Sequence, residues 1–573
     1  MGMDSDLDIA RAAKPAAIEE IAKQLNLDRS DLILQGPHIA KISWKALQKN
    51  ITNKQGSLVL VTSVNPTPFG EGKTVTTIGL NQGLNKQGHN ACCVIREPSL
   101  GPVFGIKGGA AGGGFSQVLP MEQINLHFTG DLHAITSAHN LCSAILDNYL
   151  HQGNQIKIDT NRIFWPRVID MNDRSLREVT IGLGGASNGL DRTDRFDITA
   201  ASEVMAILSL SSDYQDLRLR LGRIIVAETK GGEPVTANDI GAAGAMGLLL
   251  RDAFLPNLVQ TIEGNPAFVH CGPFANIAHG NSSIIADKIA LSCSDYVVTE
   301  AGFGAEMGAE KALNIKSLAS GIIPSCIVLN VTIRSMKLHG GGFSTGGGAR
   351  PNKSEISLEN IDAVRKGSAT NLRRHIRNLK STKIPIIVSI NKFSTDTVGE
   401  IDALTNEAKT AGANAVVLFE GHSKGGIGAI DLADAVVAAC NDYKQANSPY
   451  VPIVDPTLDV RQKILKIATN VYGAQTVDFS PEAIRTLNTI EKWNKNTLPV
   501  CMAKNQYSFS HDKKILGAPD GFIMPIRELR INAGAGFIVA VCGSMMTMPG
   551  LPSRPAALDM DMDEDGNLTG VFG

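Results

Sequence analysis

The chain has 573 residues, with 54 Lys and Arg against 56 Asp and Glu, so its formal net charge is −2. This length predicts several domains, and the 43% apolar content allows sizeable cores. A near-neutral chain without a long basic block is not expected to have nucleic acid as its main partner. Nine cysteines, an odd number with no C-x-x-C pair, favour reduced thiols and a cytoplasmic protein.

The beginning of the chain does not look like a targeting segment. Its first 25 residues carry early acidic side chains and no apolar core, unlike a signal or transit peptide. No apolar segment reaches the length that spans a bilayer, so a membrane is not expected as a partner. Apolar residues at helical spacing predict an amphipathic helix over residues 15–25.

Short, unbroken apolar runs then recur along the chain and predict strands buried on both faces, as in parallel sheets. They occupy residues 58–61, 91–95, 224–227, 267–269, 296–298, 326–329, 385–390 and 415–419. Helical patterns lie between several of them, at residues 202–210, 283–291, 358–379 and 400–411. This alternation predicts an α/β fold with a doubly wound, mostly parallel sheet that contains a P-loop, with additional smaller α/β domains.

Three domains are expected from shifts in composition. Residues 1–360 would form the nucleotide-binding domain, residues 361–455 a second α/β domain beside the ligand cleft, and residues 456–573 a C-terminal domain. Two glycine triplets within residues 334–353 suggest a mobile loop or a boundary. From about residue 455 the pattern changes towards mixed helix and irregular structure.

The most informative segment is Thr67-Pro68-Phe69-Gly70-Glu71-Gly72-Lys73-Thr74, between an apolar run and a helical pattern. Strand, glycine-rich turn, Lys-Thr and helix form a P-loop, whose backbone N–H groups bind phosphate oxygens. Lys73 would reach the β/γ-phosphates, and the Thr74 hydroxyl would bind Mg²⁺. Thr67 stands where the usual motif has glycine. The alternative is an ordinary strand-to-helix turn that contains Gly-Lys-Thr.

A second cluster, Arg96-Glu97-Pro98-Ser99, follows the next predicted strand. Ligands of open α/β sheets gather at the carboxyl ends of strands, where a cation such as Arg96 can stabilise a transferring phosphoryl group. An Arg–Glu surface pair is the alternative. The glycine-rich stretch at residues 105–114 permits close approach of a ligand or of another segment, although a flexible linker has the same composition.

Further polar residues stand near strand ends. His127 and His133 flank an acidic residue, and either a metal site or structural hydrogen bonds would fit this spacing. His270 and Glu300 each follow a predicted strand, and Glu300 is a candidate second carboxylate near Mg²⁺. The run Asn391-Lys392-Phe393-Ser394 is similar to the guanine-reading element of G proteins but lacks its aspartate, which favours adenine.

Several long strings resemble the formate–tetrahydrofolate ligase family, also called 10-formyltetrahydrofolate synthetases. They are TPFGEGKT from Thr67, REPSLGPVFGIKGGAAGGG from Arg96, INLHFTGDLHAI from Ile124, EAGFGAEMGAEK from Glu300 and MTMPGLPSRPAA from Met546. Because these strings are spread from the first part of the chain to its end, the resemblance covers nearly the whole length.

The resemblance implies ATP-dependent ligation of formate to tetrahydrofolate through formyl phosphate, giving 10-formyltetrahydrofolate, ADP and phosphate. It implies ATP, Mg²⁺, tetrahydrofolate and an activating monovalent cation, K⁺ or NH₄⁺, in a cytoplasmic homotetramer. It makes Lys73, Arg96, His127 and His133 catalytic, and gives ATP the loop Thr67–Thr74. It further implies Thr74 as a ligand of Mg²⁺, Glu97 near the monovalent cation, and Phe303, Phe393 and His422 in the folate or adenine cleft.

One position departs from the family pattern. Bacterial relatives tend to have tryptophan where this chain has His422, and an imidazole offers a smaller face that can carry charge. The sequence also argues against two other classes of protein. A P-loop switch ATPase would favour a shorter chain with a metal-binding cysteine pair, and an inactive homologue would be expected to lack Lys73, Thr74 or Arg96.

Overall fold

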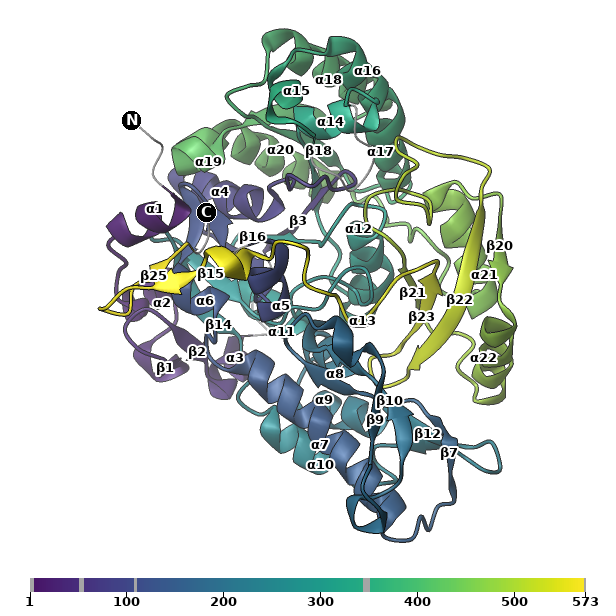
Figure 1. Ribbon diagram of the computed structural model, residues 1–573. Coiled ribbons are helices and arrows are strands. Elements are labelled where there is room, and N and C mark those ends of the chain that lie inside the picture. The colour runs from purple at the N-terminus through teal and green to yellow at the C-terminus, as the bar shows by residue number, and fades with distance from the viewer. Residues whose placement is uncertain (1–4, 51–55, 108–110, 344–350, 571–573) are drawn as a thin grey trace.

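The computed structural model describes residues 5–50, 56–107, 111–343 and 351–570 (Figure 1). Its largest unit within these residues is a sheet of 12 strands, whose main path runs β1-β2-β14-β15-β4-β16-β3-β17-β18-β19. From β15 to β19 every neighbouring pair is parallel. The predicted α/β class with a mostly parallel sheet is therefore confirmed.

The parallel strands closely match the apolar runs of the sequence. They are β3 (Ser57–Ser63), β4 (Ala91–Ile95), β15 (Pro266–Val269), β16 (Tyr296–Glu300), β17 (Cys326–Val331), β18 (Ile386–Asn391) and β19 (Ala415–Phe419). Alternate side chains of β3 enter different cores, since Leu58 and Leu60 pack away from Val59 and Val61. Because both faces of the sheet are covered, the strands carry continuous apolar runs.

Helices cover both faces of this sheet. α4 (Lys73–Lys86) and α20 (Ile430–Ala446) share one core, while α7 (Asp131–His151), α8 (Glu203–Leu210) and α11 (Ile284–Cys293) share another. α14 (Ile333–His339), α16 (Ile361–Gly367), α17 (Arg373–Lys380) and α18 (Val398–Ala411) form the lobe at the top of Figure 1. A π-helical stretch, Ser368–Leu372, joins α16 to α17 within the single predicted helix. α2 (Ile18–Gln24) lies where residues 15–25 predicted it.

The predicted domain division stays a prediction. β18 and β19, from residues 361–455, extend the same sheet as β3 and β4 from residues 1–360. The start of the predicted mobile segment is helical, since α14 covers Ile333–His339, and residues 344–350 lie outside the described residues. The glycine-rich stretch at 105–114 likewise falls partly outside them, at residues 108–110.

The last part of the chain contains a separate core around a four-stranded sheet, in the order β20-β22-β23-β21. Its strands are β20 (Thr476–Phe479), β21 (Val500–Ala503), β22 (Ile523–Asn532) and β23 (Phe537–Cys542). The prediction of helix and irregular structure missed this sheet, because β22 alternates apolar residues with Arg and Glu. The chain then returns to the N-terminal helix α1 (Asp6–Ala12), where Arg11 Nη2 donates to the carbonyl of Leu568 at 2.9 Å (Figure 1).

One of the predicted strands lies outside the large sheet. Residues 224–227 overlap β12 (Ile225–Thr229), which lies in a small antiparallel sheet with β7 (Ile158–Ile163) and β13 (Pro234–Thr236).

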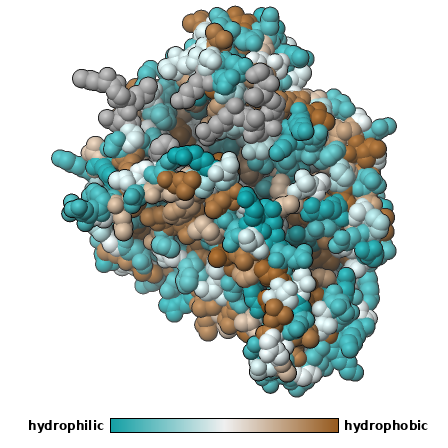
Figure 2. Space-filling view, viewed as in Figure 1, coloured by the Kyte–Doolittle hydropathy of each residue, from teal (hydrophilic) through white to brown (hydrophobic). Residues whose placement is uncertain are grey.

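All nine cysteines are buried and form no disulfide, as expected of core thiols. Among the described residues, no helix has the length and apolar character needed to cross a membrane. Figure 2 shows hydrophilic and hydrophobic residues intermingled on one face, with a recess below the upper lobe.

Candidate active site

The loop at residues 67–72 connects the end of β3 to the start of α4, as the sequence predicts. Gly70 and Gly72 have φ angles of 75° and 72°, in the left-handed region that side chains with a Cβ rarely adopt. Space is also limited, because a Cβ on Gly72 would lie 2.3 Å from Nδ2 of Asn391. Gly72 therefore lets the loop approach the end of β18 before the chain turns into α4.

Glu71 ties this loop to the neighbouring strand. Its Oε1 accepts from the backbone N–H of Thr67 at 2.9 Å, and its Oε2 accepts from Oγ1 of Thr332 at 3.0 Å. The Asn330 amide donates to the Glu71 carbonyl. Burial raises the pKa of Glu71, while these hydrogen bonds and the charge of Lys73 act in the opposite direction. The loop is thus fixed from inside by a buried carboxyl group, a contact that the sequence did not reveal.

Three predicted residues meet at the carboxyl end of the sheet. β16 lies between β3 and β4, so side chains that follow these three strands are brought close together. Glu300 accepts from Oγ1 of Thr74 at 2.7 Å through Oε2, and from Nε of Arg96 at 3.3 Å through Oε1. Arg96 also donates from Nη1 to the carbonyl of Pro273 at 3.4 Å. One carboxylate therefore joins the hydroxyl of the glycine-rich loop to the predicted catalytic arginine.

Lys73 begins α4 and reaches back across the loop. Its Nζ donates to Oγ of Ser63 at 3.2 Å, at the end of β3. The Ser63 hydroxyl also donates to the carbonyl of Phe303 at 3.1 Å. These contacts place Lys73 at the same strand end as the predicted cleft residue Phe303, whose φ of 57° makes a tight turn after β16.

Glu97 lies in a different environment from its neighbour Arg96. Its side chain is buried, and its Oε2 has no hydrogen-bond partner within the described residues. Burial, followed by the charge of Asp131, raises the pKa of Glu97 well above its usual range, whereas Lys41 acts to lower it. Asp131 is already engaged, since Lys41 Nζ lies 2.8 Å from its Oδ1 and Asn257 donates to its Oδ2 at 2.8 Å. Oε2 of Glu97 is therefore a buried acceptor that these neighbouring groups leave without a hydrogen bond.

The predicted histidines have different surroundings. His127 is exposed, and it is close enough for its charge to act on the half-buried Asp170, although desolvation dominates and raises the pKa of that carboxyl group. His133 is exposed on α7, with Nε2 3.5 Å from Oγ of Ser137. Among the hydrogen bonds and ion pairs of the described residues, none connects His127 or His133 to Lys73, Arg96 or Glu300. Their catalytic roles stay predictions.

His270 is completely buried, and both of its ring nitrogens have partners within the protein. Nδ1 lies 2.6 Å from Oγ of Ser283, and Nε2 lies 2.8 Å from the carbonyl of Ala253. Because the carbonyl can only accept, Nε2 carries the proton, and Nδ1 accepts from the serine. Burial lowers the pKa of His270 to about 4. This arrangement indicates a structural histidine rather than one that exchanges protons with a substrate.

Within the described residues, the predicted cleft residues Phe393 and His422 contact different parts of the protein. Phe393 is half-buried, and the guanidinium carbon of Arg334 lies 3.8 Å from the centroid of its ring. His422 is exposed, with Nε2 3.7 Å from Oδ1 of Asp6 in the N-terminal helix. One face of Phe393 is therefore covered by a cation, and His422 borders α1. The assignment of these residues to a folate or adenine cleft stays a prediction.

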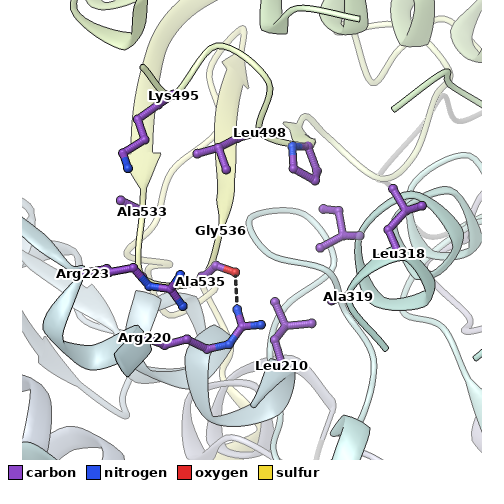
Figure 3. A pocket seen from close by; sticks show the side chains of 13 residues that line it. Leu210, Arg220, Arg223, Leu318, Ala319, Lys495, Leu498, Ala533, Ala535 and Gly536 are labelled. Atoms are coloured by element: carbon purple, nitrogen blue, oxygen red, sulfur yellow. Dashed lines mark hydrogen bonds between the residues drawn. The ribbon is translucent and has the colours of Figure 1, made fainter. Parts of the chain in front are cut away.

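The hollow in Figure 3 lies away from the contacts around Glu300. The hollow, of about 320 Å³, lies between α9 (Tyr214–Gly222), α13 (Ser317–Ser320) and the turn after β22, and Arg220 donates there to the carbonyl of Ala535 at 3.0 Å. It includes no residue of the Thr67–Thr74 loop. In the part of the chain that the structure describes, no three His, Cys, Asp or Glu side chains gather as a metal site would require. The candidate site therefore rests on the polar contacts around Glu300.

Comparison with known proteins agrees with the resemblance seen in the sequence. The family model described as "Formate--tetrahydrofolate ligase" matches residues 4–572. The chain is 51% identical over 569 residues to the formate–tetrahydrofolate ligase of Roseiflexus sp. (strain RS-1), covering 99% of this chain and 100% of that protein. It is 52% identical over 570 residues to that of Paracoccus denitrificans (strain Pd 1222), covering 100% of both. The chain belongs to the formate–tetrahydrofolate ligase family.

Proposed function

We propose that this protein ligates formate to tetrahydrofolate at the expense of ATP, and releases 10-formyltetrahydrofolate, ADP and phosphate. Family membership supports the overall reaction. The observation that carries the site assignment is the double contact of Glu300, which accepts from Thr74 at 2.7 Å and from Arg96 at 3.3 Å. A nucleotide bound at the loop would thus have its terminal phosphate beside Arg96.

In this proposal the loop Thr67–Thr74 is a P-loop. The two left-handed glycines, Gly70 and Gly72, shape the turn, and backbone N–H groups at the start of α4 bind phosphate oxygens. Lys73 would turn from Ser63 to the β/γ-phosphates. The paired oxygens of Thr74 and Glu300 are the hard ligands that Mg²⁺ prefers, and the bound ion would neutralise charge on the phosphates.

The chemistry needs a positioned carboxylate and a stabilised phosphoryl group. A formate oxygen attacks the γ-phosphorus, the bond from that phosphorus to the β,γ-bridging oxygen breaks, and ADP leaves with its electron pair. N10 of tetrahydrofolate then attacks the formyl carbon, phosphate leaves, and N10 loses its proton. Arg96, with its side chain 22% exposed, can contact both formate and the phosphoryl oxygens, which carry the charge of the transition state.

Glu97 suits the proposed monovalent-cation site. A buried carboxyl group with one oxygen lacking any partner gains from a cation, which would keep it ionised and neutralise its charge. We assign the remaining predicted roles with the same reaction in view: His127 and His133 as further catalytic residues, and Phe303, Phe393 and His422 as the folate or adenine cleft. A cytoplasmic homotetramer completes the proposal.

The test is an omission assay with purified protein, MgATP, formate and tetrahydrofolate. Phosphate release that needs all three substrates, with equimolar 10-formyltetrahydrofolate, is the expected result. Phosphate released from ATP alone at an equal rate would contradict the proposal and favour an ATPase. Repeating the assay with K⁺ or NH₄⁺ replaced by a bulky organic cation tests the site at Glu97, where a lower rate is expected.

A further inference from the structure

Arg334 carries a charge for which the described residues provide no direct partner. It is half-buried in the first turn of α14, and its buried Nε has no acceptor in the part of the chain that the structure describes. Its guanidinium carbon lies 3.8 Å from the centroid of the Phe393 ring, so stacking fixes the plane of the group. Removing a cation from water without pairing it is unfavourable, and such groups in folded proteins call for an explanation.

The two acidic groups that act on Arg334 already accept other hydrogen bonds. Glu71 and Asp396 are close enough to act on the pKa of Arg334, yet neither forms an ion pair with it among the described residues. Both oxygens of Glu71 accept from Thr67 and Thr332, and Oδ2 of Asp396 accepts from the backbone N–H of Phe393 at 2.8 Å. Burial prevails over these two charges and lowers the pKa of Arg334. The guanidinium therefore retains donors for another acceptor.

The place of Arg334 in the fold indicates where that acceptor comes from. β17 pairs with β3 on the side opposite β16, so Arg334 and Arg96 follow strands that flank the glycine-rich loop. Thr332, which caps α14, binds Glu71 of that loop directly. The two arginines thus follow strands that end at the same carboxyl edge of the sheet, on opposite sides of β3.

We propose that Arg334 is a substrate-binding residue, whose guanidinium binds an oxyanion that a substrate of the proposed ligation brings to the loop. The oxyanion is either the phosphate chain of the nucleotide or a glutamate carboxylate of the folate, and both are planar or forked acceptors that a stacked guanidinium suits. This inference rests on the proposed function for the identity of the substrates. It assigns Phe393 a supporting role, namely to hold Arg334 in position.

The test measures binding directly, without turnover. The dissociation constants of a non-hydrolysable ATP analogue with Mg²⁺ and of tetrahydrofolate are determined for the wild type, Arg334→Met and Arg334→Lys. Methionine keeps an apolar contact with Phe393 but removes the charge, whereas lysine keeps the charge without the planar fork. Arg365→Met is the matched control, because Arg365 is exposed on α16 and paired with Asp362 at 3.0 Å.

Arg334→Met should weaken the binding of one of the two ligands about 10- to 100-fold, the range for losing a hydrogen bond to a charged group. The other ligand should bind within about three-fold of wild type, and Arg334→Lys should recover part of the loss. Phe393→Leu should weaken the same ligand about two- to five-fold, because it loosens the stacked arginine. The ligand affected identifies the oxyanion as phosphate or carboxylate.

A stability measurement separates binding from a structural role. Without ligand, the Tm of Arg334→Met should equal or exceed that of the wild type, because the variant no longer buries an unpaired charge. Unchanged affinity for both ligands, or weakened affinity for both, would overturn the proposal. So would a Tm that falls together with binding. Failure of the proposed ligation would appear separately, as wild-type protein that binds nucleotide but does not require formate for phosphate release.

Discussion

His270 offers a test of whether a histidine beside the strand ends acts in stability or in chemistry. Its ring is buried, its two nitrogens are satisfied by Ser283 and Ala253, and its pKa is lowered to about 4. The ordinary value is 6.5, so the unfolded chain binds more protons than the folded chain between these two pH values. The stabilisation is fully present above pH 6.5 and is lost as the pH falls towards 4.

A difference of about 2.5 pH units corresponds to about 3 kcal/mol, of which about 2 kcal/mol is lost between pH 7.5 and pH 5. His139 and His339, also buried with pKa values of about 4, add to this acid sensitivity. Glu203 and Glu310 act in the opposite sense, because burial raises their pKa values to about 8 and about 7. Only a comparison of variants isolates the contribution of His270.

The proposed comparison is wild type against His270→Gln, with unfolding followed from pH 7.5 to pH 5. Glutamine cannot titrate and loses a buried hydrogen bond, so the variant should be less stable by about 1–3 kcal/mol at pH 7.5. The difference in unfolding free energy between the two proteins should then narrow by about 2 kcal/mol at pH 5. At that pH His270 binds a proton in the unfolded wild type but not in the folded one, which destabilises the wild type alone. His151→Gln, at an exposed position at the end of α7, is the control. A gap that is independent of pH, or that widens in acid, would refute this reasoning.

Four further substitutions address the candidate site. Lys73→Ala and Arg96→Ala should each lower kcat at least about 100-fold in a product assay, since each removes a cation that stabilises the phosphoryl group. The circular dichroism spectrum of both variants should remain native. Near-wild-type turnover by either variant would contradict the proposed site. His422→Trp should change KM for tetrahydrofolate more than KM for ATP, because it enlarges the flat surface proposed to contact the pterin; equal changes would count against that contact. Gly72→Ala should raise KM for ATP at least about ten-fold, because Gly72 has a φ of 72° and a Cβ there would lie 2.3 Å from Nδ2 of Asn391. An unchanged KM would show that the loop relaxes without affecting phosphate binding.

Much of the central sheet could be predicted because buried parallel strands leave a simple signal. The apolar runs predict Ala91–Ile95 and Ala415–Phe419 with the same bounds that the structure gives them. The strand pattern alone does not give the order of strands, since β16 lies between β3 and β4 although it follows them by about 200 residues. That non-local pairing is what brings Glu300 between Thr74 and Arg96.

The sequence was less informative where strands are half-exposed or where contacts are purely tertiary. β22 alternates apolar with charged residues, so its burial on one face was hidden within a polar run. Arg334 carries no signal of its own, because the glycines beyond it predict a loop or boundary for its segment. Its stacking on Phe393 depends on the pairing of β17 with β18, which no local motif encodes.

The most direct measurement is a crystal structure of the protein with Mg²⁺ and a non-hydrolysable ATP analogue. We predict that oxygens of the terminal phosphate lie about 2.7–3.2 Å from both Nζ of Lys73 and the guanidinium of Arg96, with Thr74 and Glu300 facing the metal ion. A triphosphate bound away from these two cations would contradict the central claim that phosphoryl transfer and formate activation share one site at the end of β3.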